Sequence, residues 1–421
     1  MAVGPESAHV PSGGGLLGWI DQRFPLTKLW KSQVAEYYAP KNFNFWYYFG
    51  VLSLVVLANQ LITGIFLTMQ YKPSAAEAFA SIEYIMRDVD GGWLIRYMHS
   101  TGASAFFIVI YLHMFRALLY GSARKPRELI WIFGCLIFLL LMAEAFMGYV
   151  LPWGNMSYWG AQVIVSLFSS LPWIGAGLVE WIRGDYYIAD ATLNRFFALH
   201  VAALPLALVF LVIAHLMALH EVGSNNPDGI EIHKYNDDKG RPLDGIAFHP
   251  YYTVKDLVGV AGFLLLFFGV IFFAPTFGGL FLEAPNFEPA NPLQTPPHIA
   301  PVWYFTPFYA MLRAVPSFAG TQVWGVMVMG ASVLILFFLP WLDRSPVKSI
   351  RYRGPIYKIM LTIFVLSFIA LAVCGLKPPS GIYPTLAKVC TILYFAFFLL
   401  MPWYTKIDRV KPVPERVTGH D

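Results

Sequence analysis

The amino-acid sequence predicts an all-α polytopic membrane protein with eight transmembrane helices. Its 421 residues are 57% hydrophobic and only 13% charged, whereas a soluble domain carries roughly 25% charged residues. The apolar residues also gather in runs of about 20, the length that crosses a bilayer. A soluble fold of this size could not bury so much apolar surface. The composition therefore excludes disorder, a secreted disulfide scaffold and a nucleic-acid-binding protein.

Eight apolar runs qualify as membrane spans. Three cysteines all lie inside apolar runs, which is typical of structural thiols. Residues 1–15 are polar and rich in glycine, so no cleaved signal peptide is expected there. In chain order, the spans are expected at 45–69, 93–119, 129–150, 194–219, 254–274, 320–340, 356–375 and 385–403.

Basic residues mark one side of the membrane. Most lysines and arginines fall in the N-terminal arm, in the loops after the second, fourth and sixth spans, and in the C-terminal tail. The alternate loops hold far fewer. Under the positive-inside rule, this asymmetry places both termini in the cytoplasm.

Two of the outer loops, 152–192 and 275–319, are long, poor in charge and rich in aromatic residues and proline. Such segments either lie at the interface and wall a pocket or pack against partner subunits. We divide the chain into an arm at 1–44, a four-helix bundle at 45–219 that includes the first of these loops, and a C-terminal domain at 220–421 that includes the second.

Four histidines lie inside the predicted spans, where ionisable side chains are costly and usually functional. His99 and His113 are fourteen residues apart in the second span, about 21 Å along one helix face. His200 and His215 occupy the fourth span, which runs in the same direction. Each histidine of one span therefore has a partner at its own depth in the other.

Two such pairs can each supply two axial nitrogens to one planar metal cofactor. We expect two b-type haems in the core of the first four helices, because the chain lacks the C-x-x-C-H motif of covalently attached haem. One haem would lie between His99 and His200, and the other between His113 and His215. Scattered interfacial histidines or a proton relay are the alternatives, and matched pairs disfavour both.

One spacing is irregular, because His200 and His215 are fifteen residues apart rather than fourteen. One extra residue would rotate the second ligand by about 100°. Pro205 lies between them and removes a backbone hydrogen bond. We therefore expect a kink or a wide turn near Pro205 that absorbs the extra residue.

Glycines and arginines near the histidines also favour haem binding. Glycine pairs fourteen residues apart in spans one and three would let a flat group approach, although such glycines usually serve helix packing. Arginines near the histidines can neutralise haem propionates, although snorkelling at helix ends competes with this role. The residues concerned are Gly50, Gly64, Gly134, Gly148, Arg96, Arg116 and Arg195.

Long strings of the sequence resemble the cytochrome b subunit of bacterial quinol–cytochrome c oxidoreductases, the respiratory complex III. They follow the family's order across almost the whole chain. The strings are RYMHSTGASAFF at 96–107, FMGYVLPWGNMSYWGA at 146–161, RFFALH at 195–200, HEVGSNNPDG at 220–229, FHPYYTVKD at 248–256 and PANPLQTPPHIAPVWYF at 289–305.

The resemblance implies an enzyme of the bacterial inner membrane that couples quinol oxidation to proton translocation. It implies a homodimer with a Rieske iron–sulfur protein and a membrane-anchored c-type cytochrome. Quinol is oxidised in an outer pocket. One electron then passes to the iron–sulfur cluster, and the other passes through the two haems to quinone in an inner pocket.

The resemblance also implies the residues of both pockets. Aromatic packing at the interface is the alternative role for the outer set, and helix capping or a weak surface ion pair is the alternative for the inner set. The outer set is Phe146, Tyr149, Gly160, Ile164, Pro301, Tyr304, Phe305 and Tyr309. The inner set, which would relay cytoplasmic protons to quinone, is His220, Ser224, Lys255 and Asp256.

The chain departs from the family at one position. The family usually has Pro-Glu-Trp-Tyr, whose glutamate is thought to take a quinol proton, but this chain has Val302 there. We hypothesise that Glu144, an intramembrane carboxylate near Phe146, replaces it, or that Glu144 pairs structurally with a nearby donor. Glu283 and Glu288 are weaker candidates, because their loop is expected to be wet.

Other classes of protein predict different features. A transporter would have discontinuous helices and midplane charges, with no reason for matched histidine pairs. A di-haem membrane anchor of another quinone-linked oxidoreductase would explain the histidines but not spans five to eight. The photosynthetic relative is usually split into two chains, although its fourth helix shares the fifteen-residue spacing.

Overall fold

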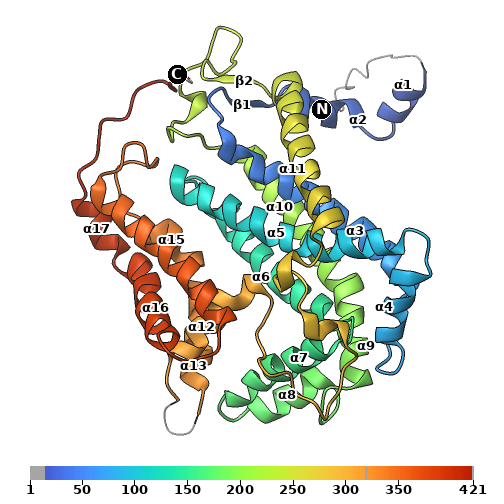
Figure 1. Cartoon of the computed structure of the whole chain (residues 1–421). Helices are drawn as coiled ribbons and strands as arrows, with labels where there is room; N and C mark the ends of the chain where they lie inside the picture. The colour runs from blue at the N-terminus through green and yellow to red at the C-terminus, as the bar shows by residue number, and fades with distance from the viewer. Residues whose placement is uncertain (1–14, 318–320, 420–421) are drawn as a thin grey trace, which may run out of the picture.

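The structure, a computed structural model, describes residues 15–317 and 321–419 and is built largely from helices (Figure 1). Within these residues, seven helices are long and apolar enough to cross a membrane, and the pair α16–α17, bent by 61°, makes an eighth. The predicted fold class is confirmed. Residues 1–14 of the arm and the first residue of the predicted sixth span lie outside the described residues.

The spanning segments match the predicted runs closely. They are α3 (Tyr48–Thr68) with η2 (Phe45–Tyr47), α5 (Gly92–Tyr120), α6 (Glu128–Val150), α9 (Asp190–Ala198) with η4 (Leu199–Ala203) and α10 (Leu204–Val222), α11 (Thr253–Phe273) with η6 (Phe248–Tyr252), α13 (Val323–Leu334) with η10 (Ile335–Phe338) and α14 (Leu339–Leu342), α15 (Pro355–Leu376), and α16 (Tyr383–Leu399) with α17 (Met401–Ile407).

The connecting segments contain shorter elements. They are α1 (Leu16–Asp21), α2 (Leu26–Trp30), η1 (Lys31–Ala35), β1 (Tyr38–Pro40), α4 (Ala78–Arg87), α7 (Asn155–Leu167), η3 (Phe168–Ser170), α8 (Gly175–Arg183), η5 (Ile232–Lys234), β2 (Gly245–Ala247), η7 (Phe277–Gly279), η8 (Ala284–Phe287), η9 (Trp303–Phe305) and α12 (Thr306–Ala314).

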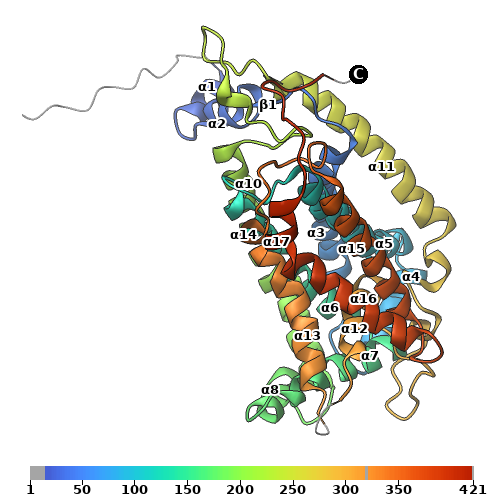
Figure 2. The ribbon, with the colours of Figure 1, turned by 90° about the vertical axis from the view of Figure 1, so that its left-hand side faces the viewer.

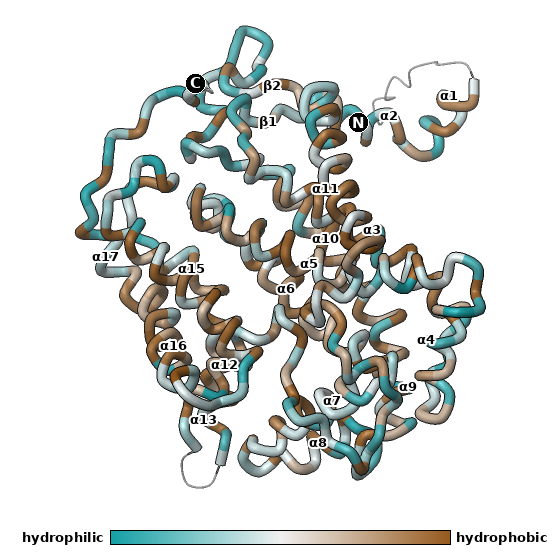
Figure 3. Tube along the Cα trace, in the orientation of Figure 1, coloured by the Kyte–Doolittle hydropathy of each residue, from teal (hydrophilic) through white to brown (hydrophobic). Residues whose placement is uncertain are grey.

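The long helices run between two ends of the molecule (Figure 2), and hydrophilic residues gather at the end that holds β1 and β2 (Figure 3). The antiparallel pair β1–β2 lies at one end, here called the termini end, and α7 and α8 lie at the opposite, distal end. Asp244 ties both chain ends together, because its carboxylate is 3.0 Å from the Lys41 Nζ atom and 2.8 Å from the Arg416 Nε atom. The N-terminal arm and the C-terminal tail therefore share one end.

The first four spans pack as two close pairs, α3 with α5 and α6 with α10, and α11 packs on α3 and α5. Helices α12, α13, α15 and α16 form a second group (Figure 1). Hydrogen bonds join the groups: Trp131 donates to the Leu336 carbonyl and Tyr111 to the Tyr304 carbonyl. The Phe107 and Tyr304 rings stack between them with centroids 3.9 Å apart.

The fourth span contains the expected wide turn. Residues Leu199–Ala203 form a π-helix, directly before α10, in which Pro205 is one of the first two residues. A π-turn holds more residues than an α-turn. It therefore absorbs the extra residue between His200 and His215, and both histidines face the bundle interior.

Candidate functional site

The structure brings the four histidines together in two pairs inside the bundle. The ring centroids are 6.2 Å apart for His99 and His200 and 6.4 Å apart for His113 and His215. With metal–nitrogen bonds of about 2.0 Å, two imidazoles that share one metal ion have centroids about 6.3 Å apart. Both pairs therefore fit bis-imidazole ligation of a metal cofactor.

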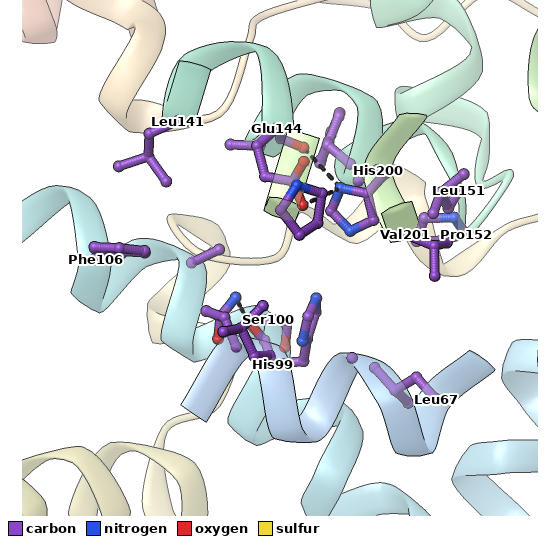
Figure 4. A pocket seen from close by; sticks show the side chains of 18 of the residues that line it. Leu67, His99, Ser100, Phe106, Leu141, Glu144, Leu151, Pro152, His200 and Val201 are labelled. Atoms are coloured by element: carbon purple, nitrogen blue, oxygen red, sulfur yellow. Dashed lines mark hydrogen bonds and ion pairs between the residues drawn. The ribbon is translucent and has the colours of Figure 1, made fainter. Parts of the chain in front are cut away.

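Hydrogen bonds set the tautomer of the distal pair. Thr63 donates its hydroxyl proton to the Asn59 carbonyl, so its oxygen accepts from the His99 Nδ1 atom at 2.9 Å. His200 donates from Nδ1 to the Glu144 carbonyl at 2.9 Å (Figure 4). A proton on Nδ1 leaves the Nε2 lone pair free to bind a metal.

Each of the predicted glycines faces one histidine ring. A Cβ atom at Gly64, Gly134 or Gly50 would lie 3.3, 3.5 or 3.7 Å from the Cε1 atom of a histidine. The partner is His99 for Gly64, His215 for Gly134 and His113 for Gly50. At Gly148 a Cβ atom would clash with the His200 ring. The four glycines thus give the imidazoles room beside α3 and α6.

An apolar cavity of about 470 Å³ opens beside the distal pair. It is lined by His99, His200 and Arg96, and it reaches Tyr149 and Val302. A cavity of this size and composition suits a cofactor or an apolar ligand. The site for the distal cofactor and the predicted outer pocket therefore share one space.

The three predicted arginines have different surroundings. Arg96 lines the cavity. Arg116 lies 5.3 Å over the Tyr120 ring and donates to the Asn225 carbonyl near the termini end. Its Nε atom is buried and has no hydrogen-bond partner among the described residues. Arg195 is outside the cavity lining and donates to the Trp181 carbonyl beside α8.

The predicted outer-pocket residues divide into two groups. Tyr149 and Tyr304 line the cavity, and Gly160 is adjacent, since a Cβ atom there would lie 3.8 Å from the Tyr149 ring. The others lie outside the lining: the Phe146 ring packs on Phe196, Phe305 packs on Tyr304, and Tyr309 lies under Arg313. Ile164 and Pro301 also lie outside it.

The expectation that the loop around Glu283 is wet holds for its exposed residues but not for Glu283 itself, which is partly buried. The Tyr149 hydroxyl donates to the Glu283 Oε2 atom at 3.1 Å. Burial raises the pKa of the Glu283 carboxyl to about 7, although this hydrogen bond acts in the opposite direction. Glu288, five residues on, is exposed.

The loop is held in place by its backbone and by one side chain. The Glu288 carbonyl accepts from the Asn155 backbone N–H at 2.8 Å, and the Ala290 N–H donates to the Trp153 carbonyl at 2.9 Å. The Asn286 side chain accepts from the Ser157 N–H at 2.9 Å. These bonds fix residues 286–290 against the start of α7, so the neighbouring Glu283 carboxylate is kept beside α6.

Glu144 lies against His200. Its Oε1 atom is 3.0 Å from the His200 Nδ1 atom, and its Oε2 atom is buried and has no hydrogen-bond partner in the described part of the chain. The residue also lines the cavity. The contact with His200 is the structural pairing that the sequence left open as an alternative.

The predicted inner-pocket residues surround an aromatic cluster at the termini end. The His220 ring packs edge-on against Tyr37 at 4.8 Å, and the Tyr37 hydroxyl is 3.0 Å from the Ser224 hydroxyl. The Lys255 Nζ atom donates to the Phe43 carbonyl at 3.2 Å. The Asp256 Oδ1 atom is buried without a hydrogen-bond partner among the described residues.

The sequence analysis missed Thr63 and Tyr37, which contact predicted site residues from elsewhere in the chain. Thr63 had a detectable signal, because it is a polar residue directly before Gly64 in an apolar span. Tyr37 had none, since it lies in the N-terminal arm, where nothing in the local pattern indicates a contact with His220.

The fold and the paired histidines define a polytopic helical membrane protein with two bis-imidazole positions in one bundle. Two family models match the chain: "Cytochrome b/b6/petB" over residues 34–223 and "Cytochrome b(C-terminal)/b6/petD" over residues 289–395. The chain belongs to the cytochrome b family.

Individual relatives agree with this assignment. The chain is 65% identical to a cytochrome b of Allochromatium vinosum, over 96% of this chain and 98% of that protein. It is 48% identical to a cytochrome b of Rickettsia prowazekii, over 97% and 99%. A chain of a solved hyperthermophilic respiratory complex III matches with a TM-score of 0.85 and 40% identity, over 93% of this chain and 99% of that one.

Proposed function

We propose that this cytochrome b is the quinone-reactive subunit of a proton-translocating quinol–cytochrome c reductase. It oxidises quinol in the distal cavity and reduces quinone near the termini end. The observation that carries the proposal is the centroid distance within each histidine pair, 6.2 and 6.4 Å, which suits one redox cofactor with two imidazole ligands per pair. Membership of the cytochrome b family and the likeness to a complex III chain support it.

Two haems of b type fit the donor atoms. His99 and His200 would hold the haem near the distal end, and His113 and His215 the haem nearer the termini end. The bound haems would supply one-electron redox centres on the two sides of an apolar barrier. The chain itself sets the tautomer of His99 through Thr63 and that of His200 through the Glu144 carbonyl. Arg96, which lines that cavity, would be a counter-charge for a propionate.

Quinone reduction needs protons at the termini end. His220 and Asp256 can donate and relay protons, Lys255 can neutralise a quinone anion, and Ser224 can hydrogen-bond a ring oxygen. The unpaired oxygen of Asp256 supports this role, because a buried polar atom without a partner requires an explanation. Asp256→Asn is expected to slow quinone reduction about tenfold, whereas Asp238→Asn in the exposed loop is the matched control.

The partners and the location follow from the same proposal. We propose a homodimer with a Rieske iron–sulfur protein and a membrane-anchored c-type cytochrome in a bacterial inner membrane, with both termini in the cytoplasm. Lys41 of the N-terminal arm and Arg416 of the C-terminal tail lie at the same end, which supports the last point, as does the excess of basic residues there. Trp173 and Trp181, exposed at the distal end, suit the membrane interface or a partner surface.

The proposed function is tested on the purified complex. Dithionite-reduced minus oxidised spectra should show two b-type haems per chain, and the complex should reduce cytochrome c with quinol. Absence of b-type absorbance, or of quinol oxidation by a complex that contains all its subunits, would contradict the proposal.

A further inference from the structure

The resemblance stated above implies a carboxylate at position 302, but the distal cavity has Val302 there. Val302 lines the cavity and is only 4% exposed, and its side chain cannot accept a proton. Glu144 also lines the cavity, but its Oε1 atom already contacts the His200 imidazole. A group other than Val302 must take the proton that quinol releases when it is oxidised.

The distal loop supplies a carboxylate by another route. Tyr149 lines the cavity, and its hydroxyl donates to the Glu283 Oε2 atom at 3.1 Å. Glu283 itself is partly buried and lies in a loop whose neighbouring residues, such as Ala284 and Glu288, are exposed. The phenol therefore connects the cavity with a carboxylate in the partly exposed distal loop.

We propose that Glu283 accepts a quinol proton through the Tyr149 hydroxyl and so replaces the carboxylate that is absent at Val302. The proposal rests on quinol oxidation in the distal cavity, the function proposed above. Tyr149 is the catalytic residue, since it would contact quinol, and Glu283 acts through it.

The transfer balances as a two-proton relay. The O–H bond of quinol breaks and its proton binds the Tyr149 oxygen, while the original Tyr149 proton moves to the Glu283 Oε2 atom. The products are a quinol monoanion, a neutral tyrosine and a neutral glutamic acid. The anion then loses one electron to an acceptor of the iron–sulfur class and becomes a neutral radical, and Glu283 releases its proton at the distal end.

The protonation of Glu283 suits this role. Burial raises the pKa of its carboxyl to about 7, so the group changes between acceptor and acid near neutral pH. The titratable groups that face it are Tyr149 from α6 and Tyr304 from η9, and burial raises the pKa of the Tyr304 hydroxyl further above its ordinary value. Tyr304 thus stays neutral while Glu283 titrates.

The experiment measures quinol oxidation by the complete complex between pH 5.5 and 8.5. Glu283→Gln keeps an oxygen that can accept from Tyr149 but cannot take up a proton. We expect its rate at pH 7 to fall about tenfold or more. We expect the unmodified complex to show a rise in rate around pH 7, because only the ionised carboxylate accepts a proton, and we expect Glu283→Gln to lose this rise. Glu288→Gln, an exposed glutamate of the same loop, should keep rate and profile.

Rescue separates proton acceptance from a structural role. Adding Val302→Glu to Glu283→Gln should restore at least half of the lost rate, because it returns a carboxylate to the cavity by the family's usual route. Glu283→Asp should keep the pH-dependent rise, and it becomes the decisive variant if Glu283→Gln does not accumulate. Unchanged spectra of both haems show that a variant is assembled.

The outcomes distinguish the two proposals. A complex that oxidises quinol normally with Glu283→Gln and keeps its pH profile overturns the relay and leaves the proposed function intact. Loss of the pH-dependent rise in Glu283→Asp also overturns it. An unmodified, complete complex that does not oxidise quinol overturns the proposed function itself.

Discussion

The Nδ1 atom of His200 lies 2.9 Å from the backbone carbonyl oxygen of Glu144 and 3.0 Å from its Oε1 atom. The imidazole N–H is thus shared between a carbonyl and a carboxylate. A carboxylate on this hydrogen makes the other ring nitrogen a stronger donor to a metal, which favours the ferric state.

Glu144→Gln should therefore raise the midpoint potential of the haem held by His99 and His200. A change of about 1 kcal/mol in the balance of oxidation states corresponds to about 40 mV for one electron. Potentiometric titration of the haem bands measures it. Glu128→Gln, at the other end of α6, should leave the potential unchanged, and an unchanged or lower potential in Glu144→Gln would refute the argument.

The space beside each glycine predicts how much haem is lost when that glycine is replaced by alanine. Gly148→Ala should abolish occupancy of the distal haem position, because its Cβ atom would clash with the His200 ring, whereas Gly50→Ala, with 3.7 Å of clearance, should be tolerated. Gly269→Ala in α11, where nothing lies within 4 Å, is the control. Haem content per chain is the measurement, and equal loss in all three variants would contradict the steric explanation.

The π-turn predicts opposite effects for two deletions. Deleting Ala202 inside Leu199–Ala203 should convert the turn to α-helix and keep His200 and His215 on one face, with both haems bound. Deleting Ala207 in the regular part of α10 should rotate His215 by about 100° and lose the haem nearer the termini end. Pyridine haemochrome assays and difference spectra count the haems, and the same haem content in both variants would show that the turn does not set the register.

A partly buried charge cluster of Arg127, Glu231 and Lys348 at the termini end predicts a pH-dependent loss of stability. Burial alone would raise the pKa of Glu231, but hydrogen bonds from Arg127 and Lys348 outweigh it and lower that pKa to about 2. Because the folded pKa is below the unfolded one, the stabilisation is complete above about pH 4.5 and is lost as the pH falls toward 2.

Glu231→Gln should therefore reduce the free energy of unfolding by about 1 kcal/mol at pH 7, a value that allows for screening of its partly exposed side chain. Thermal unfolding in detergent measures the difference, with Glu415→Gln in the exposed tail as the control. The difference should shrink below pH 4.5, and one that grows there would contradict the assigned sign.

The sequence predicted the fold and the histidine pairs because both depend on periodicity along single helices. The length of an apolar run determines whether it can span the bilayer, and a fixed rise per residue brings His99 and His113 to defined depths. The wide turn at Leu199–Ala203 was predictable for the same reason. In a regular α-helix, a fifteen-residue interval rotates the second ligand by about 100° relative to a fourteen-residue one, and Pro205 lies within the longer interval. The division into 1–44, 45–219 and 220–421 stays a prediction.

The environment of Glu283 could not be predicted in this way. Its contact with Tyr149 joins residues 134 positions apart, and hydrogen bonds from the backbone around Trp153 to residues of the same loop hold it there. Local composition indicated a charged loop residue and hence a hydrated one. Only the packing of the loop against α6 and α7 shows that the carboxylate is shielded.

The presence of two bis-histidine haems is tested most directly by redox titration of purified complexes that each carry one histidine substitution, with the b-type haem absorbance as the readout. His99→Ala and His200→Ala should each remove the same b-type component, and His113→Ala and His215→Ala should each remove the other, with the second component retained in every case. If any of these variants kept both six-coordinate low-spin components, or if the unmodified complex had only one, the paired ligation proposed for this bundle would be wrong.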